Sequence, residues 1–231
     1  QRRSESPVPA LLWTATAVAA PRAILIALYW RGAHFDRSLP LAALALALAA
    51  LYGYVTELLS KRMPRPGLAG SAAVFATGAV AALALAFTFA LDKGWLTVAL
   101  ALMVPGIAWI AEQRPLPALR YLAAGVVVLV LLRTGYEPRI VGDDIGTTPI
   151  FNWLLYGYGV PAAAFWTAGI LLRRRADDVP ARMADSAAIL FTVLLLMLEI
   201  RHYINNGDVF RNSTALAEIA MQIAVGLALS I

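Results

Sequence analysis

The sequence has no cysteine and very little charge. Its 231 residues include 19 Lys or Arg, 14 Asp or Glu and 2 His, and charged residues make up 14% of the chain. The absence of cysteine excludes disulfides, thiolate metal sites and a cysteine nucleophile. Soluble domains have about 25% charged residues, and a chain with so few cannot cover a soluble surface. Together with 61% hydrophobic residues, this composition leaves a polytopic helical membrane protein.

Recognisable catalytic and cofactor motifs are also missing. The sequence has no glycine-rich phosphate loop, and its serines lack an adjacent base. The two histidines, His34 and His202, do not have metal-ligand spacing. Asp143 and Asp144 are compatible with a divalent cation, but they also fit ordinary turn chemistry and have no ligand series around them. We therefore expect no metal and no cofactor, and the missing motifs favour a protein without catalysis while leaving an enzyme open.

Long apolar runs fill most of the chain. A bilayer core needs roughly 20 apolar residues in a helix that rises about 1.5 Å per residue. The run Leu41–Leu51 is apolar on all sides rather than alternating, which indicates helices instead of barrel strands. The sequence therefore predicts an all-α polytopic bundle of about eight spans. These are Pro9–Trp30, Leu39–Leu59, Leu68–Leu91, Trp95–Ala111, Leu116–Leu132, Ile150–Leu172, Ala184–Ile200 and Thr214–Ile231.

Basic residues in the loops predict the orientation. With eight spans, eleven Lys or Arg lie on the side of the N-terminus, seven on the other side, and Arg22 within the first span. The positive-inside rule then places the N-terminus in the cytoplasm. We expect residues 1–231 to form a single transmembrane domain. Because the chain does not begin with Met and stops inside an apolar run, we interpret it as part of a larger protein.

Two helix pairs have a similar layout. Trp95 opens one span and Pro105 lies within it, while Trp153 and Pro161 take the same places in another. This layout fits a weak internal repeat, as found in many membrane folds. It also fits the general preference of Trp for membrane interfaces and the frequency of Pro in membrane helices. The repeat is therefore one of two interpretations.

The second half of the chain resembles a known family. The resemblance is carried by Asn152–Pro161 (Asn-Trp-Leu-Leu-Tyr-Gly-Tyr-Gly-Val-Pro), by Leu198–His202 (Leu-Glu-Ile-Arg-His) and by Trp95, Trp109 and Arg120. These stretches resemble a bacterial polytopic membrane family catalogued as domain of unknown function 2339, over roughly residues 93–231. The resemblance implies arrays of many spans. It implies no particular reaction, cofactor or catalytic residue.

Ionisable residues within the spans are candidate site residues, because a charge at the bilayer centre costs at least about 2.5–3.5 kcal/mol. Arg22 and Glu218 both fall in the outer half of the predicted bundle. We expect them to pair and to line a non-catalytic polar site, which Gln222 and Glu199 extend. A purely structural ion pair is the alternative. Glu57 lies four residues before Lys61, and an ion pair at the interface explains it.

Basic residues at the inner ends of spans are expected to contact lipid. Each is worth about 1 kcal/mol near an anionic surface, and a solvated stop signal is the alternative. Membrane lipids, and other membrane subunits, are the expected partners. The net charge of +5 does not indicate nucleic acid, because no binding module accompanies it. The expected headgroup contacts are Lys61, Arg62, Arg65, Arg173, Arg174 and Arg175.

Three functions from different classes stay open. The leading one is a structural or envelope-associated membrane protein without catalysis. The second is a transporter or lipid-handling protein that uses a polar site in the outer leaflet. The third is a membrane glycosyltransferase of the lipid-linked-sugar type, which resembles this chain in its acidic residue after the first span, Asp36. The loop that carries Asp36 is short for such an active site.

Overall fold

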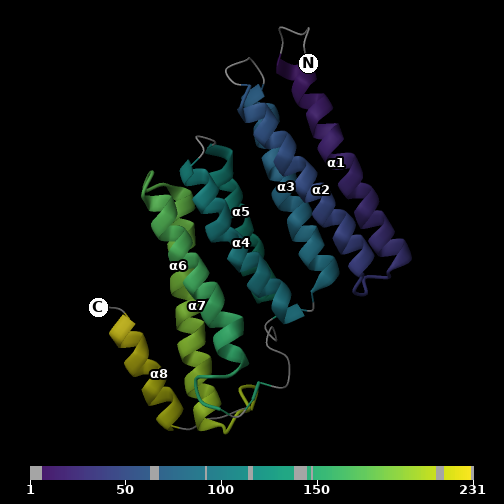
Figure 1. The fold of residues 1–231 in the computed structure, drawn as a ribbon. Helices are drawn as coiled ribbons and strands as arrows, with labels where there is room; N and C mark the ends of the chain where they lie inside the picture. The colour runs from purple at the N-terminus through teal and green to yellow at the C-terminus, as the bar shows by residue number, and fades with distance from the viewer. Residues whose placement is uncertain are drawn as a thin grey trace. The chain divides into compact units, whose positions relative to one another are not determined.

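A computed structural model describes residues 7–62, 68–91, 93–113, 117–137, 145–146, 148–211 and 216–229. Within these ranges all regular secondary structure is helical, which confirms the all-α fold class (Figure 1). In chain order the elements are α1 (Pro7–Gly32), α2 (Leu39–Ser60), α3 (Leu68–Ala90), α4 (Lys93–Gln113), α5 (Pro117–Tyr136), the π-helix η1 (Leu155–Gly159), α6 (Val160–Arg173), α7 (Val179–Ile204) and α8 (Leu216–Leu229).

Seven of the described helices are long and apolar enough to cross a bilayer. They are α1 to α5, the continuous run of η1 and α6, and α7, and their apolar parts contain 19–26 residues. A crossing needs roughly 20 residues. The apolar part of α8, Leu216–Ala228, is shorter, and the ends of the expected eighth span lie outside the described residues. A polytopic helix bundle is therefore confirmed, while the eighth span and the orientation stay predictions.

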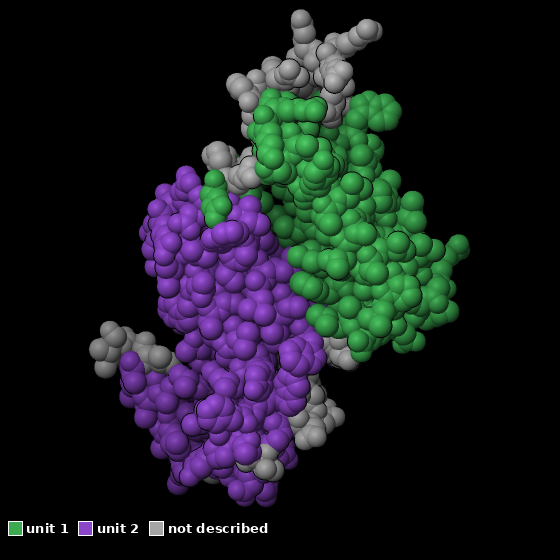
Figure 2. Space-filling model, in the orientation of Figure 1, with its two compact units in different colours: residues 1–92, 113–122 green, residues 93–112, 123–231 purple. Residues whose placement is uncertain are grey.

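The chain divides into two compact units (Figure 2). One comprises Gln1–Asp92 and Gln113–Leu122, and the other comprises Lys93–Glu112 and Ala123–Ile231. The single domain expected from the sequence stays a prediction.

The first unit is a bundle of α1, α2 and α3, in which small residues let the helices approach closely (Figure 1). Gly78 of α3 is the clearest case, because a Cβ atom there would meet both Val18 of α1 and Tyr52 of α2. The Tyr52 hydroxyl lies 3.1 Å from the carbonyl oxygens of Ala17 and Val18, to which it donates. Close backbone approach and interhelical hydrogen bonds are the usual means of joining helices in lipid, where hydrophobic burial between helices gives little.

The second unit is organised around the pair of α6 and α7, which contact each other along their length (Figure 1). Their core includes Phe165 and Phe191, which are fully buried with ring centroids 5.4 Å apart. Asp178 caps the start of α7, since its side chain accepts a hydrogen bond from the Ala181 amide at 3.3 Å. The helix α8 contacts α7 and follows it directly in the chain.

The two similar helix pairs correspond to α4–α5 and α6–α7. Pro105 lies inside α4, and Pro161 lies in the first turn of α6, directly after η1. In the described ranges only the second pair contains a π-helical turn. The internal repeat stays a prediction.

Candidate ligand site at one end of the second unit

The buried side chain of Asn152 holds together the segment that leads into η1. Its Oδ1 accepts hydrogen bonds from the backbone N–H of Leu154 at 2.8 Å and of Leu155 at 3.4 Å. These bonds cap the start of η1, where backbone N–H groups otherwise lack partners. Its Nδ2 donates to the Thr148 carbonyl at 3.3 Å and to Glu199 Oε2 of α7 at 3.0 Å. Asn152 therefore uses both ends of its amide to fix this segment against α7.

The π-helix η1 determines which aromatic side chains face outward. Its sequence is Leu-Tyr-Gly-Tyr-Gly, and π-helical turns are rare and frequently accompany functional sites. Tyr156 is 51% exposed, whereas Tyr158, two residues later, is buried. The turn therefore leaves one Tyr available to a ligand and packs the other against Phe191.

The last turns of α7 place two buried polar atoms beneath this segment. His202 is 2% exposed, and its Nε2–H donates to the Gly146 carbonyl at 2.8 Å. In a neutral ring this bond makes Nδ1 an acceptor, and Nδ1 has no hydrogen-bond partner among the described residues. Glu199 Oε1 is likewise buried without a hydrogen-bond partner among the described residues. Because Glu199 and His202 are three residues apart, they share one face of α7.

A pocket of about 620 Å³ opens at this end of the unit. Three of its aromatic rings meet at steep angles. The rings of Trp95 and Trp153 have centroids 5.2 Å apart and planes at 84°, and those of Trp153 and Tyr156 are 5.8 Å apart at 67°. An apolar pocket with a few placed polar groups is the usual form of a small-ligand site. The lining residues are Trp95, Ile145, Gly146, Thr148, Phe151, Asn152, Trp153 and Tyr156.

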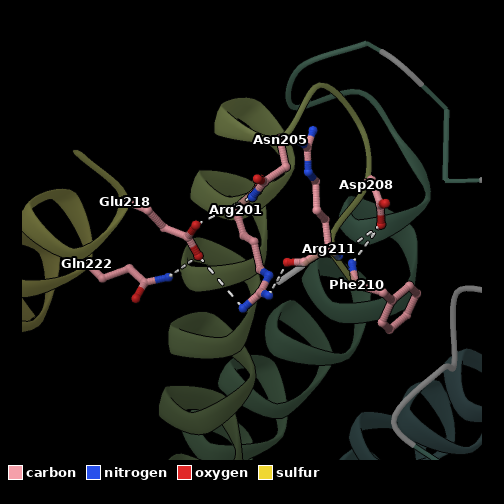
Figure 3. A network of polar contacts seen from close by, with 7 residues as sticks. All are labelled: Arg201, Asn205, Asp208, Phe210, Arg211, Glu218 and Gln222. Carbon is pink, nitrogen blue, oxygen red and sulfur yellow. Dashed lines mark hydrogen bonds and ion pairs between the residues drawn. The ribbon is translucent and has the colours of Figure 1, made fainter. Parts of the chain in front are cut away.

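A second polar network joins α8 to the end of α7 (Figure 3). Glu218 is 4% exposed, and its Oε1 lies 3.7 Å from Arg201 Nη1. Asn205 Nδ2 and Gln222 Nε2 each donate to the Glu218 carboxylate at 3.4 Å. Arg201 Nη2 donates to the Arg211 carbonyl at 2.5 Å, so the same guanidinium also holds the loop before α8. This carboxylate is well satisfied and serves to attach α8.

The structure brings together only some of the residues predicted to form one polar site. Glu218 and Gln222 meet, as their spacing of four residues predicts. Glu199 instead bonds to Asn152, on the side of the pocket. Arg22 belongs to the first unit, where its Nε donates to the Val18 carbonyl at 2.8 Å. The pairing of Arg22 with Glu218 joins the two units and stays a prediction.

Several of the predicted lipid contacts have protein partners. Lys61 pairs with Glu57 at 3.4 Å, as predicted, and Arg62 is exposed. Arg65 lies outside the described residues. The headgroup contacts stay a prediction. In the second unit the partners are Asp185 and Asp177 for Arg173, Glu112 for Arg174, and the Glu112 carbonyl for Arg175.

The acidic residues considered for metal or sugar chemistry form no cluster in the part of the chain that the structure describes. No group of three His, Cys, Asp or Glu side chains suited to a metal occurs there. Asp36 is exposed in the turn after α1, where its amide donates to the Ala33 carbonyl at 2.7 Å. Asp143 and Asp144 lie outside the described residues.

Asn152 and the aromatic pocket were not among the predicted site residues. The available signal was an Asn directly before an apolar run, which is typical of a helix cap. The partner of its side chain, Glu199, lies 47 residues away in the chain. Such a contact depends on the packing of η1 against α7 and cannot be read from local spacing.

Comparison with known proteins identifies the family. The model of the predicted membrane protein family DUF2339 matches residues 2–231, so the chain belongs to this family. The match is wider than residues 93–231, over which the sequence motifs suggested it. No match was found among curated proteins or among solved structures.

Proposed function

We propose that this member of the DUF2339 family is a non-catalytic integral membrane protein that binds the polar head of an amphiphile in the pocket beside Asn152. The proposal joins the non-catalytic role and the lipid-handling role expected from the sequence. It places the protein in a bacterial inner membrane with the N-terminus in the cytoplasm, so that the pocket faces the outer side. The observation that carries it is the 620 Å³ pocket, with aromatic walls and a rigid polar support.

The support matters because a binding site needs a fixed shape. The floor of the pocket is formed by the segment of residues 145–146 and 148–152, the floor segment. It is attached to α7 by two hydrogen bonds, one from Asn152 to Glu199 and one from His202 to the Gly146 carbonyl. Side chains that hold binding groups in place reduce the entropy lost on binding. Two independent bonds from one helix to one segment therefore favour a preformed site over a loose surface loop.

The position of the pocket favours an amphiphile. Trp95 lies near the start of α4, Trp153 lies just before η1, and Glu199 and His202 lie near the end of α7. The pocket therefore lies at the ends of apolar spans, where lipid headgroups meet the protein. Trp95 and Phe151 are 51% and 76% exposed, so apolar surface continues outward from the pocket and can contact the rest of such a molecule.

The alternatives have less support from the described geometry. The polar groups of the pocket lining are the Asn152 amide, the hydroxyls of Thr148 and Tyr156 and the indole N–H groups of Trp95 and Trp153, and none of these residues carries a charge at neutral pH. Asp36, on which the glycosyltransferase interpretation depends, belongs to the other unit. A purely structural role does not explain why the protein has this pocket.

Native mass spectrometry of the detergent-purified chain tests the proposal. Supplied with a mixed lipid extract, the wild-type protein should retain at least one lipid that Trp153→Ala loses. Trp109→Ala is a matched control, because Trp109 is an exposed Trp of α4 that does not line the pocket. The control should retain lipid as the wild type does. Equal retention by all three proteins would contradict the proposal.

A further inference from the structure

We infer that the pocket selects a cation, and that its occupant is the ammonium headgroup of a membrane lipid. This inference rests on the proposed function, because it names the chemical class of the head that the pocket binds. It follows from three features of the pocket: the angles between its rings, the use of its hydrogen-bond donors and the charge behind its floor.

The aromatic rings form the walls of a corner. Trp153 stands at 84° to Trp95 and at 67° to Tyr156, with centroids 5.2 and 5.8 Å away. Rings in edge-to-face contact leave no space between them, but a small group in the corner beside the contact can lie against the ring faces that line the pocket. A cation within about 6 Å of an aromatic face is attracted by the ring quadrupole, and Trp gives the strongest attraction. Aromatic cages of this kind recognise ammonium groups.

Several donors of the floor segment are already bonded within the protein. Asn152 donates to Thr148 and Glu199, and the Thr148 hydroxyl donates to the Phe151 carbonyl at 2.7 Å. The backbone N–H groups of Phe151 and Trp153 are also bonded within the segment. A phosphate or carboxylate needs such N–H and O–H donors. The indole N–H groups of Trp95 and Trp153 and the Tyr156 hydroxyl also line the pocket, so the preference for a cation depends on the ring faces and on the carboxylate behind the floor.

A carboxylate lies directly behind the floor. Glu199 Oε2 is 3.0 Å from Asn152, while Oε1 is buried without a hydrogen-bond partner, and no cationic side chain pairs with Glu199 in the described ranges. The neighbouring Arg201 pairs with Glu218 instead. In a low-dielectric site an uncompensated carboxylate attracts a cation strongly.

One basic residue of α5, Arg133, contacts α4. Its Nε donates to the Thr97 hydroxyl at 3.2 Å. The charged side chain bonded to Asn152 in the pocket floor is that of Glu199.

A headgroup competition measured by native mass spectrometry tests the inference. The full chain is offered equal amounts of phosphatidylethanolamine and phosphatidylglycerol with identical acyl chains. The wild type should retain the ammonium lipid with about tenfold preference, the combined effect expected of the cation–π contacts and of the Glu199 charge. Trp95→Leu and Trp153→Leu should reduce this preference to about threefold, and Trp109→Leu should leave it unchanged.

Glu199→Gln tests the electrostatic part, because it removes the charge and keeps an oxygen that can accept from Asn152. The preference should fall by about threefold, the effect expected of one partly screened charge interaction. An unchanged preference would show that the carboxylate does not act on the headgroup and would overturn this part.

The outcomes separate this inference from the proposed function. Lipid retention that depends on Trp153 but shows no preference, or favours phosphatidylglycerol, overturns the ammonium assignment alone. Retention that is independent of Trp153 removes the proposed function as well. Displacement of the lipid by equimolar glycerophosphoethanolamine would overturn the assignment to lipid in favour of a soluble amine.

A second measurement keeps the inference testable if the Trp variants do not fold. Tetramethylammonium titrated into the wild-type protein should shift its tryptophan fluorescence in a saturable way, whereas an equal concentration of sodium should not. Identical responses to the two cations would overturn the inference.

Discussion

The attachment of α8 depends on the buried carboxylate of Glu218, which pairs with Arg201. Removing either partner of this ion pair should destabilise the attachment, but by different amounts. The Glu218 side chain is 5% exposed and the Arg201 side chain 30% exposed, with Oε1 and Nη1 3.7 Å apart. Arg201→Ala leaves the buried carboxylate with only the amides of Asn205 and Gln222, at 3.4 Å each. Glu218→Ala leaves a guanidinium that water already reaches. We therefore expect Arg201→Ala to cost more.

The magnitudes follow from burial. Breaking a buried pair so that one charge is left uncompensated costs about 3–5 kcal/mol. The two amides of Asn205 and Gln222 offset part of this, so we expect about 3 kcal/mol for Arg201→Ala. For Glu218→Ala we expect about 1–2 kcal/mol, the range for a hydrogen-bonded group whose partner stays solvated. The double variant should cost less than the sum of the two, because both remove the same interaction.

Hydrogen–deuterium exchange of residues 216–229 in detergent is the suitable measurement, because it reports the local opening of α8 rather than unfolding of the remaining helices. Arg201→Ala should accelerate exchange in α8 about 100-fold, from the 3 kcal/mol above. A double-mutant cycle of Glu218→Ala with Arg22→Ala tests the pairing predicted from the sequence. Strong coupling of Glu218 to Arg22, with additive effects for Arg201, would refute the assignment of Arg201 as its partner.

Two further predictions concern packing and topology. Gly169→Ala should destabilise the α6–α7 pair by about 1–3 kcal/mol, because the new Cβ would overlap Asp185. Gly106 has open space around it, so Gly106→Ala should be neutral or mildly stabilising. Equal melting temperatures for the two variants would contradict this prediction. Because the chain has no cysteine, single Cys residues at Arg62 and at Tyr136 can be labelled cleanly, and they should react with an impermeant reagent from opposite sides of the membrane. Labelling from the same side would contradict the topology.

The sequence was sufficient to predict the spans because each span is encoded locally. Some 20 consecutive apolar residues are recognisable without any tertiary contact, and seven such helices occur in the described part of the chain. The bond between Glu218 and Gln222 was predictable for the same reason, because a spacing of four residues places two side chains on one helix face.

The pocket could not be predicted, because it depends on contacts between distant segments. Asn152 and Glu199 are 47 residues apart, and Trp95 and Trp153 are 58 residues apart. The π-helical turn that separates exposed Tyr156 from buried Tyr158 has no firm sequence signature beyond its glycines. The contact of Glu218 with Arg201 likewise depends on the packing of α8 against α7, which no local spacing encodes.

Photo-cross-linking of a lipid in a native-like membrane is the most direct test of the central claim. The wild-type chain in nanodiscs is exposed to a phosphatidylethanolamine analogue with a photoreactive group next to its headgroup, and the adducts are mapped by peptide mass spectrometry. We expect adducts within residues 145–156 and at Trp95, at levels that unlabelled phosphatidylethanolamine reduces and phosphatidylglycerol does not. Adducts spread evenly over the ends of all spans, with no enrichment in residues 145–156, would contradict this claim.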